Sequence, residues 1–340
     1  MRNSEQIAKV SHNVYTIRRC VQKRPALNTI RGMSMPFEIA FSAFGPPDVL
    51  VWSADGDNAD PLPSQIVIRV IAAGINGIDA QMRSGEMTGI QLVPLPSVPG
   101  REAAGIVVAV GSGVTAVAIG DSVVGFTDSG AYAEFAVMTH FVPKPARMPW
   151  EVAAAIPVAG EMAVRLLSAL RLARGERLVV AGGAGRVGAL VTQLAVAQGV
   201  RVVATVRAED EAYVRSVGAT PVRYGRGFAD RVYLVSPSGM DGAVDTAGSE
   251  VLPDLITMTG GAHRVVSCAG ATADRFGVSV PEPLTDWHRK DALRQVVALV
   301  DVGAVRVRIG RTYPMAHAAL AHRDLEAGAV RGKLVLHNGH

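Results

Sequence analysis

The sequence predicts an α/β protein whose two parts are built differently. Between Pro36 and Arg147, short β-rich runs alternate with turn residues, which is typical of a barrel-like or sandwich domain. After Gly175, short apolar strands alternate with helical stretches, which is typical of a doubly wound parallel sheet. The chain has 340 residues, of which 49% are hydrophobic, so it holds enough apolar material for one large or two medium domains.

The expected strands of the first part are runs rich in β-branched and aromatic residues, separated by glycine and polar turns. They cover residues 65–71, 104–110, 121–126 and 131–137. An Ala- and Leu-rich stretch follows at residues 151–172. It has few turn formers and predicts a helix that is interrupted near Pro157 and Gly160.

The second part begins with a strand, a glycine-rich turn, a helix and another strand, which is the order of a parallel-sheet unit. Further short apolar runs extend this pattern towards the end of the chain. The expected elements are strands at 177–181, 200–206, 242–245, 263–267 and 332–336, a turn at 182–188, and helices at 187–198 and 293–302.

The formal charge of +4 is unevenly distributed along the chain. Residues 1–33 hold seven basic residues and one acidic residue, a net +6, which leaves −2 for the rest. A nucleic-acid-binding protein usually carries its positive charge on folded surface with interleaved aromatics, and aromatics are only 5% here. We therefore expect no nucleic-acid partner. The leader at 1–33 is either a disordered extension, with Met33 or Met35 as alternative starts, or a segment similar to an organelle transit peptide.

Glycine or charge interrupts every long apolar run, although the mean hydropathy is positive. The longest candidate, residues 106–124, contains three glycines and Asp121. A membrane-spanning helix needs about 20 apolar residues, so we expect a cytoplasmic protein with no membrane partner. Cys20 and Cys268 are the two cysteines, and they can form neither a disulfide framework nor a four-thiolate zinc site.

Three glycines with the G-x-G-x-x-G spacing, Gly183, Gly185 and Gly188, lie between a predicted strand and a predicted helix. The first permits a tight turn, the second lets a pyrophosphate approach the backbone, and the third lets the helix pack closely on the strand. The helix N-terminus offers free N–H groups and a positive dipole end to phosphates. The motif predicts a dinucleotide site, and the loop residues expected to bind the cofactor are Gly182, Gly183, Ala184, Gly185, Arg186, Val187 and Gly188.

The end of the following strand indicates which dinucleotide is bound. In an NAD site, an acidic residue near this position binds the ribose 2′-hydroxyl. Here the strand is followed by Arg207, and the first acidic residue is Glu209. A guanidinium group is well matched to a 2′-phosphate, so Arg207 favours NADPH. The alternative for Arg207 is a solvated surface arginine.

The order of motifs from Met35 to Leu336 resembles the zinc-independent quinone oxidoreductases of the medium-chain dehydrogenase/reductase superfamily. The matching segments are 44–50, 72–79, 83–85, 99–105, 110–114, 120–123, 130–134, 153–157, 218–219, 245–248 and 332–336. The resemblance implies a GroES-like barrel domain, residues 34–157 and 296–340, that is split by an inserted Rossmann-type domain, residues 158–295. It also implies a homodimer and hydride transfer from NADPH to a quinone, enal, enone or enoyl thioester in a cleft between the domains.

By this resemblance, Asn76 faces the substrate cleft, where its amide orients a substrate carbonyl or a ribose hydroxyl. The alternative is an asparagine that stabilises the turn at Gly77. Gln81, Met87 and Met162 stand where the family commonly has tyrosine, tyrosine and threonine. They imply either a pocket remodelled for a bulkier, more apolar substrate or the filling of apolar space. A thioether cannot donate a proton, so solvent is expected to supply it.

Further cofactor contacts are expected at the carboxyl edge of the parallel sheet and near the phosphates. Tyr224 is expected beside the adenosine phosphate, or else as a surface aromatic. Lys333 is expected either to reach a phosphate or to be a surface lysine at a strand end. The remaining expected contacts are Thr246, Ser267, Cys268 and Ala269, and Cys268 is not expected to act as a nucleophile.

The sequence predicts no metal site. The zinc-dependent relatives use a Gly-His-Glu segment, and the matching place here reads Gly100-Arg101-Glu102. A catalytic zinc needs about three protein ligands, and the chain has no cysteine between Cys20 and Cys268. Two other functions stay open on the same fold: a biosynthetic double-bond reductase for one pathway intermediate, and a non-catalytic NADPH-binding relative.

Overall fold

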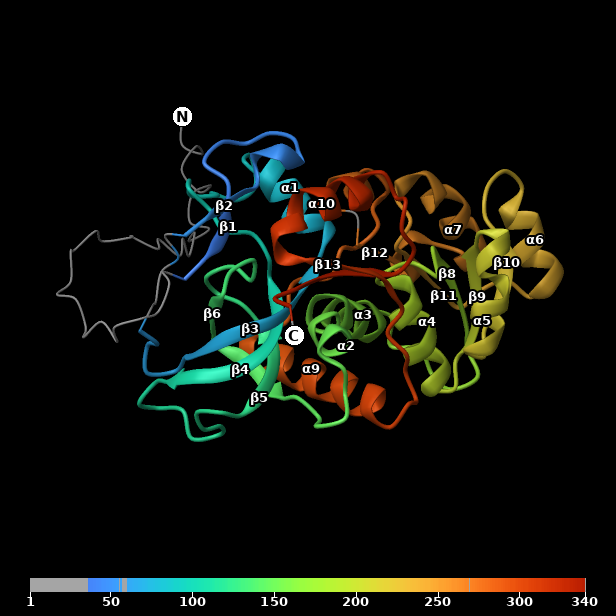
Figure 1. The fold of residues 1–340 in the computed structure, drawn as a ribbon. Helices are drawn as coiled ribbons and strands as arrows, with labels where there is room; N and C mark the ends of the chain where they lie inside the picture. Colours follow the sequence, from blue (N-terminus) through green and yellow to red (C-terminus); the bar gives the residue numbers. More distant parts are fainter. Residues whose placement is uncertain (1–35, 55, 57–59, 269, 340) are drawn as a thin grey trace, which may run out of the picture. The chain divides into compact units, whose positions relative to one another are not determined.

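The structure is a computed structural model that describes residues 36–339 except 55, 57–59 and 269. The leader at 1–33 and the predicted cofactor contact Ala269 therefore lie outside the described residues. Within the described part, the strands form three sheets of two, five and seven strands (Figure 1). No helix of this part is long and apolar enough to cross a membrane.

The seven-stranded sheet combines strands from the first half of the chain with two strands from its C-terminal end. Its order is β13-β14-β3-β4-β5-β7, with β6 paired to β3. Strand β14 pairs antiparallel with β3, so the C-terminal residues return to the β-rich part. Register shifts between β3 and β4 mark bulges, which bend a sheet. The strands are β3 (Ile66–Ile75), β4 (Glu102–Val110), β5 (Ser122–Phe126), β6 (Phe135–Met138), β7 (His140–Pro143), β13 (Ile309–Pro314) and β14 (Lys333–His337).

Shorter elements accompany this sheet. They are strands β1 (Glu38–Ala40) and β2 (Val51–Ser53), and helices α1 (Gly77–Ser84), α2 (Trp150–Ala154) and α10 (Ala318–Glu326). The buried Arg83 of α1 donates to the Gly45 carbonyl at 2.5 Å and pairs with Glu326 of α10. This arginine therefore connects α1 with α10.

The five-stranded sheet is entirely parallel and has the order β10-β9-β8-β11-β12. The chain starts in the middle at β8, adds β9 and β10 on one side, and then adds β11 and β12 on the other. The order reverses between β8 and β11, as in a doubly wound sheet. The strands are β8 (Arg177–Ala181), β9 (Arg201–Val206), β10 (Thr220–Arg223), β11 (Gly242–Asp245) and β12 (Val265–Ser267).

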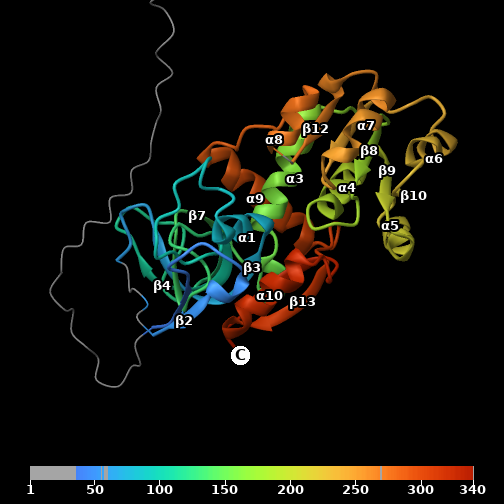
Figure 2. The same ribbon diagram turned by 90° about the horizontal axis from the view of Figure 1, so that it is seen from above.

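Helices cover both faces of the parallel sheet. Because successive strand residues point to opposite faces, Leu178 and Val180 of β8 pack in one core cluster and Val179 and Ala181 in another. The first cluster includes residues of α3, α4 and α9, and the second includes residues of α6 and α7. Figure 2 shows α3 beside α9. The helices are α3 (Pro157–Leu170), α4 (Gly188–Ala197), α5 (Glu211–Ser216), α6 (Phe228–Val235), α7 (Leu252–Thr259), α8 (Gly270–Ala273) and α9 (Asp286–Asp301).

The architecture confirms the predicted α/β fold of a GroES-like part and a parallel-sheet part, while several boundaries differ. Pro157 begins α3, but Gly160 lies inside it, where a Cβ atom would sit 3.2 Å from a methyl group of Val296 on α9. Gly160 therefore permits close helix packing and does not interrupt the helix. The helix expected at 293–302 begins at Asp286, so the domain boundary expected at 295/296 falls inside α9.

A buried polar contact links the β-rich part to α10. Tyr132 and His322 are both fully buried, and the tyrosine oxygen lies 3.1 Å from the Nε2 atom of His322. Burial lowers the pKa of His322 to about 4, and the charge of Arg83 adds to this shift. The imidazole is therefore neutral in the folded protein at neutral pH.

We expect the free energy of unfolding of His322→Gln, relative to that of the wild type, to fall as the pH rises from 4 to 6.5. The folded pKa lies below the unfolded value of 6.5, so unfolding takes up a proton in this window. The contribution of His322 to the free energy of unfolding therefore rises with pH across this window, by about 3 kcal/mol. Urea unfolding at pH 4.5 and pH 7 measures the difference. A variant that keeps the full wild-type slope would assign the titration to another group.

Candidate functional site

The residues predicted to bind the dinucleotide gather at one edge of the parallel sheet. The glycine-rich loop, residues 182–188, follows β8, Arg207 follows β9, and Tyr224 follows β10. Thr246 follows β11 and Cys268 follows β12. Since the five strands are parallel, their carboxyl ends meet at the same edge, which is where open α/β sheets bind ligands.

The glycine loop is shaped by backbone packing. Gly182 has a φ of +77°, and its carbonyl accepts from the Gly185 N–H at 2.9 Å, so Gly183 lies inside a tight turn that begins at Gly182. Gly183 is required for a different reason, because a Cβ atom there would lie 2.5 Å from the Cβ of Ala204 on β9. A Cβ atom on Gly188 would lie 2.1 Å from the Gly182 carbonyl oxygen. This contact fits the close helix–strand packing that the motif predicts.

The outer part of the loop has the properties of an anion site. Gly185 is exposed, and a Cβ atom there would meet only the Gly182 carbonyl oxygen, at 3.1 Å. Arg186 is half-buried, burial lowers its pKa, and it forms no ion pair with a carboxylate of the described residues. Helix α4 begins at Gly188 with the positive end of its dipole. Open backbone, an arginine and a helix N-terminus together fit a pyrophosphate group.

An open hollow of about 470 Å³ lies at the ends of β9 and β10. It is lined by Val206, Arg207, Ala208, Glu209, Arg223 and Tyr224. Arg207 is exposed, and Tyr224 is 57% exposed. The hollow therefore offers guanidinium groups to an anion and an aromatic ring to a planar base.

The ends of β11 and β12 are held by local hydrogen bonds. The Thr246 hydroxyl donates to the Ala181 carbonyl at 2.7 Å, which ties the end of β11 to the start of the glycine loop. The buried Ser267 hydroxyl donates to the Asp245 carboxylate at 2.7 Å. Burial raises the pKa of the Cys268 thiol to about 11, with the charge of Asp245 adding to the shift, so this side chain is a thiol at neutral pH.

The backbone donors at the end of β12 are already used within the protein. The N–H of Ser267 donates to the Ser279 carbonyl and the N–H of Cys268 to the Asp245 carbonyl, both at 3.1 Å. A backbone contact between these residues and a nicotinamide carboxamide stays a prediction, and it would use their carbonyl oxygens because these two N–H groups are already bonded.

Asn76 and Lys333 lie in a buried cluster around Glu102, in the seven-stranded sheet. One oxygen of Glu102 accepts from Asn76 Nδ2 at 2.9 Å and from Lys333 Nζ at 2.5 Å. The other oxygen accepts from the Val158 N–H at the start of α3, at 2.7 Å. Lys333 Nζ also donates to Asn76 Oδ1 at 2.7 Å.

The prediction that Lys333 is a surface lysine is wrong. The residue is 2% exposed because β14 lies between β3 and β13, inside the sheet. Its ammonium group is held by Glu102 and Asn76, which also removes Lys333 from the expected phosphate contacts.

Asn76 stabilises its turn and takes part in this cluster. Its backbone N–H donates to the Asp79 carboxylate at 2.8 Å at the start of α1. The side-chain contacts use one amide hydrogen and one lone pair of the oxygen, so a second amide hydrogen remains. Contact between Asn76 and a substrate stays a prediction. Burial raises the pKa of Asp79 to about 7, and the charge of Glu102 adds to this shift.

Glu102 was not among the site residues predicted from the sequence. A signal was present, because Glu102 and Lys333 are opposite charges at the starts of two apolar strand runs. Gly74 on β3 leaves room for the carboxylate, since a Cβ atom there would lie 2.1 Å from Glu102 Oε1.

In the part of the chain that the structure describes, no group of three His, Cys, Asp or Glu residues is placed to hold a metal ion.

The three predicted pocket residues lie on separate segments. Gln81 is exposed on α1, and Met87 is half-buried in the turn that follows this helix. Met162 is half-buried on α3 and packs against the same core cluster as Cys268. Its sulfur accepts from Arg165 Nη2 at 3.1 Å, so Met162 does more than fill apolar space. That the three residues share one pocket stays a prediction.

We expect Lys333→Met to lower the free energy of unfolding by about 3–5 kcal/mol, because it leaves the Glu102 carboxylate buried without its cation. Urea unfolding at pH 7 measures the loss. The double variant Lys333→Met/Glu102→Gln removes the buried charge as well, and we expect it to recover part of the loss. Equal stability of the single and double variants would contradict this account.

The chain is similar to known oxidoreductases over almost its whole length. Residues 62–146 match the alcohol dehydrogenase GroES-like domain, and residues 217–336 match the family described as zinc-binding dehydrogenase. The chain is 31% identical to the quinone oxidoreductase of Rattus norvegicus, over 90% of this chain and 98% of that protein. It is 29% identical to the chloroplastic NADPH-dependent alkenal/one oxidoreductase of Arabidopsis thaliana, over 92% of this chain and 83% of that protein.

A solved structure supports the same assignment. The quinone oxidoreductase of Escherichia coli, complexed with NADPH, superimposes with a TM-score of 0.77 at 26% identity. The match covers 88% of this chain and 99% of that chain. With the GroES-like part, the parallel sheet and its glycine loop in the same order along the sequence, the chain belongs to the quinone oxidoreductase family of the medium-chain dehydrogenase/reductase superfamily.

Proposed function

We propose that the chain is an NADPH-dependent oxidoreductase that transfers a hydride to a quinone or an α,β-unsaturated carbonyl without a metal. The observation that carries the proposal is that a glycine-rich loop and an arginine-lined hollow lie at the same edge of the parallel sheet. The names of the relatives support it, because they include quinone and alkenal/one oxidoreductases.

The residues at the sheet edge fit NADPH. Open backbone at Gly185, the half-buried Arg186 and the start of α4 suit the pyrophosphate. Arg207 and Arg223 suit a 2′-phosphate, and Tyr224 offers its ring beside them. When bound, NADPH supplies the hydride.

The acceptor side needs a group that orients a carbonyl and a source for one proton. In this proposal, the remaining amide hydrogen of Asn76 donates to the substrate carbonyl, and Glu102 and Lys333 hold the amide in place. Gln81, Met87 and Met162 line the acceptor pocket. Solvent supplies the proton, since an enolate or hydroquinone anion is basic enough to take it up.

The experiment that tests the function is NADPH consumption against a panel of quinones, alkenals and enones, with NADH in parallel. Turnover with NADPH supports the proposal and ranks the acceptors. NADPH binding without turnover on any member supports one of the two alternatives, a reductase for one pathway intermediate or a non-catalytic NADPH binder. Absence of NADPH binding overturns the proposal.

The proposal includes a homodimer in the cytoplasm. Light scattering of the purified full-length chain measures the oligomeric state, and fractionation of the source cells measures the location. A monomeric mass would overturn the first part, and an organellar location would favour the transit-peptide interpretation of residues 1–33.

We expect Arg207→Ala to raise the KM for NADPH about tenfold and leave the KM for NADH unchanged, because one charge-assisted contact with the 2′-phosphate is lost. Steady-state kinetics with the best acceptor of the panel gives both values. Arg201→Ala is the matched control, since Arg201 is an exposed arginine at the opposite end of the same strand. An equal rise for both cofactors would contradict the role of Arg207 in phosphate recognition.

A further inference from the structure

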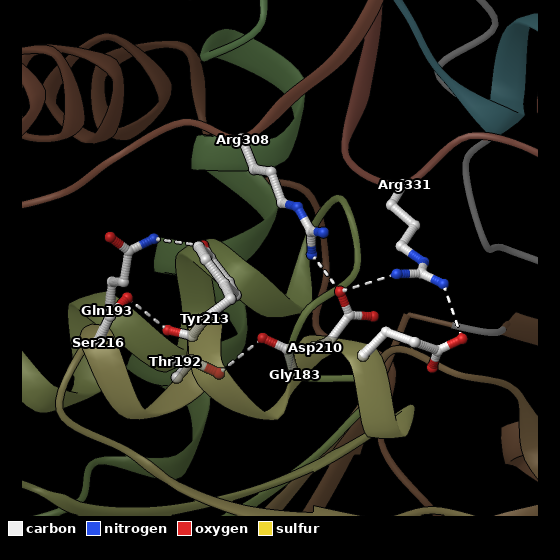
Figure 3. A network of polar contacts seen from close by, with 9 residues as sticks. Gly183, Thr192, Gln193, Asp210, Tyr213, Ser216, Arg308 and Arg331 are labelled. Carbon is white, nitrogen blue, oxygen red and sulfur yellow. Dashed lines mark hydrogen bonds and ion pairs between the residues drawn. The ribbon is translucent and has the colours of Figure 1, made fainter.

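Two arginines from the C-terminal region meet the short segment that follows β9. Arg308 Nη1 lies 2.7 Å from Asp210 Oδ1, and Arg331 Nη1 lies 3.8 Å from the same oxygen. The other nitrogen of the Arg331 fork, Nη2, donates to Glu209 Oε1 at 3.0 Å. Figure 3 shows Arg308 and Arg331 converging on Asp210. Asp210 is 5% exposed, so a nearly buried carboxylate pairs with both arginines and holds them close together.

The arginines come from segments that are themselves held in place. The Arg308 guanidinium lies 4.9 Å from the centre of the Tyr213 ring, and its carbonyl accepts from the Lys333 N–H at 2.8 Å. Gln193 of α4 donates to the Arg306 carbonyl at 3.0 Å and accepts from the Arg306 N–H at 2.8 Å. These hydrogen bonds fix the backbone at Arg306 and Arg308 and join it to the strand that begins two residues after Arg331.

Glu209 is the acidic residue of the hollow that also contains Arg207 and Arg223. A carboxylate near the end of this strand recognises a ribose 2′-hydroxyl in NAD-binding proteins, and the same negative charge repels a 2′-phosphate. A hollow that binds a 2′-phosphate therefore requires the negative charge of Glu209 to be paired with a cation. Arg331 is such a cation, since it pairs with Glu209 and also lies near Asp210.

We propose that Arg331 is a specificity-determining positioning residue: by pairing with Glu209 it neutralises this carboxylate and holds it on the Arg331 side of the hollow, which favours a 2′-phosphate over a 2′-hydroxyl. The inference rests on the proposed NADPH-dependent function. Arg331 itself does not contact the cofactor in this scheme, because it acts through Glu209.

The test compares kcat/KM for NADPH and for NADH in the wild type and in Arg331→Ala. We expect the NADPH/NADH ratio to fall about fivefold, the scale of one exposed charge interaction, through a higher KM for NADPH. The KM for NADH stays the same or falls, since the released carboxylate can accept from the 2′-hydroxyl. The difference shrinks at high salt, because the charges involved are exposed.

Three further variants separate positioning from general damage. Arg331→Ala/Glu209→Gln removes the released charge, and we expect the ratio to return to the wild-type value. Arg331→Lys keeps the positive charge and preserves most of the ratio. Arg311→Ala is the matched control: this exposed arginine pairs with Asp324, and its loss leaves the ratio unchanged.

The outcomes distinguish failure of this inference from failure of the proposed function. A wild type that uses NADH as well as NADPH overturns the cofactor preference and this inference together. A wild type that prefers NADPH, with the same ratio in Arg331→Ala, overturns the role of Arg331 alone. An equal loss with both cofactors and a lower Tm also overturns it. Arg331→Gln, which keeps most of the side-chain length, takes the place of the alanine variant if that variant fails to fold.

Discussion

The buried carboxylate of Glu102 is the interaction on which much of the molecule depends. It accepts hydrogen bonds from Asn76 at the start of α1, from Lys333 at the start of β14 and from the Val158 N–H at the start of α3. Burying a charge away from water costs free energy unless hydrogen bonds and an opposite charge compensate for the lost hydration. Removing one of these partners leaves the charge buried without that compensation. The three elements are therefore fixed relative to β4 by the same group.

This arrangement reaches from the seven-stranded sheet to the nucleotide-binding edge. Glu102 accepts from the N-terminal turn of α3, where a negative charge also complements the helix dipole. Helix α3 packs on α4 and on β12, and Met162 of α3 shares a core cluster with Cys268. The position of α3 thus connects the candidate substrate residues with the strands whose ends form the candidate cofactor site.

The sequence predicted the parts of the fold that carry a strong local pattern. The apolar strands β8, β9 and β11 and the glycine loop lie where they were expected. Strands β10 and β13 were missed because they mix polar residues with apolar ones, as in Arg311 and Thr312. Lys333 was misplaced because a charge at a strand end usually lies at the surface, whereas its partner Glu102 is 231 residues away. The pair of Arg331 with Glu209 spans 122 residues, so local spacing held no sign of it.

Arg331 and Lys333 lie two residues apart, and their ion pairs have different effects because they differ in burial. Lys333 is 2% exposed and pairs with a fully buried carboxylate, so its loss acts on folding. The Arg331 side chain is 37% exposed and its partner Glu209 is 59% exposed, so that pair contributes little to stability. The exposed pair can still influence ligand choice, because an unpaired carboxylate repels a dianionic phosphate but accepts a hydrogen bond from a hydroxyl. The segment that begins β14 therefore stabilises the fold through one cation and biases the cofactor through the other, and the two effects appear in different measurements.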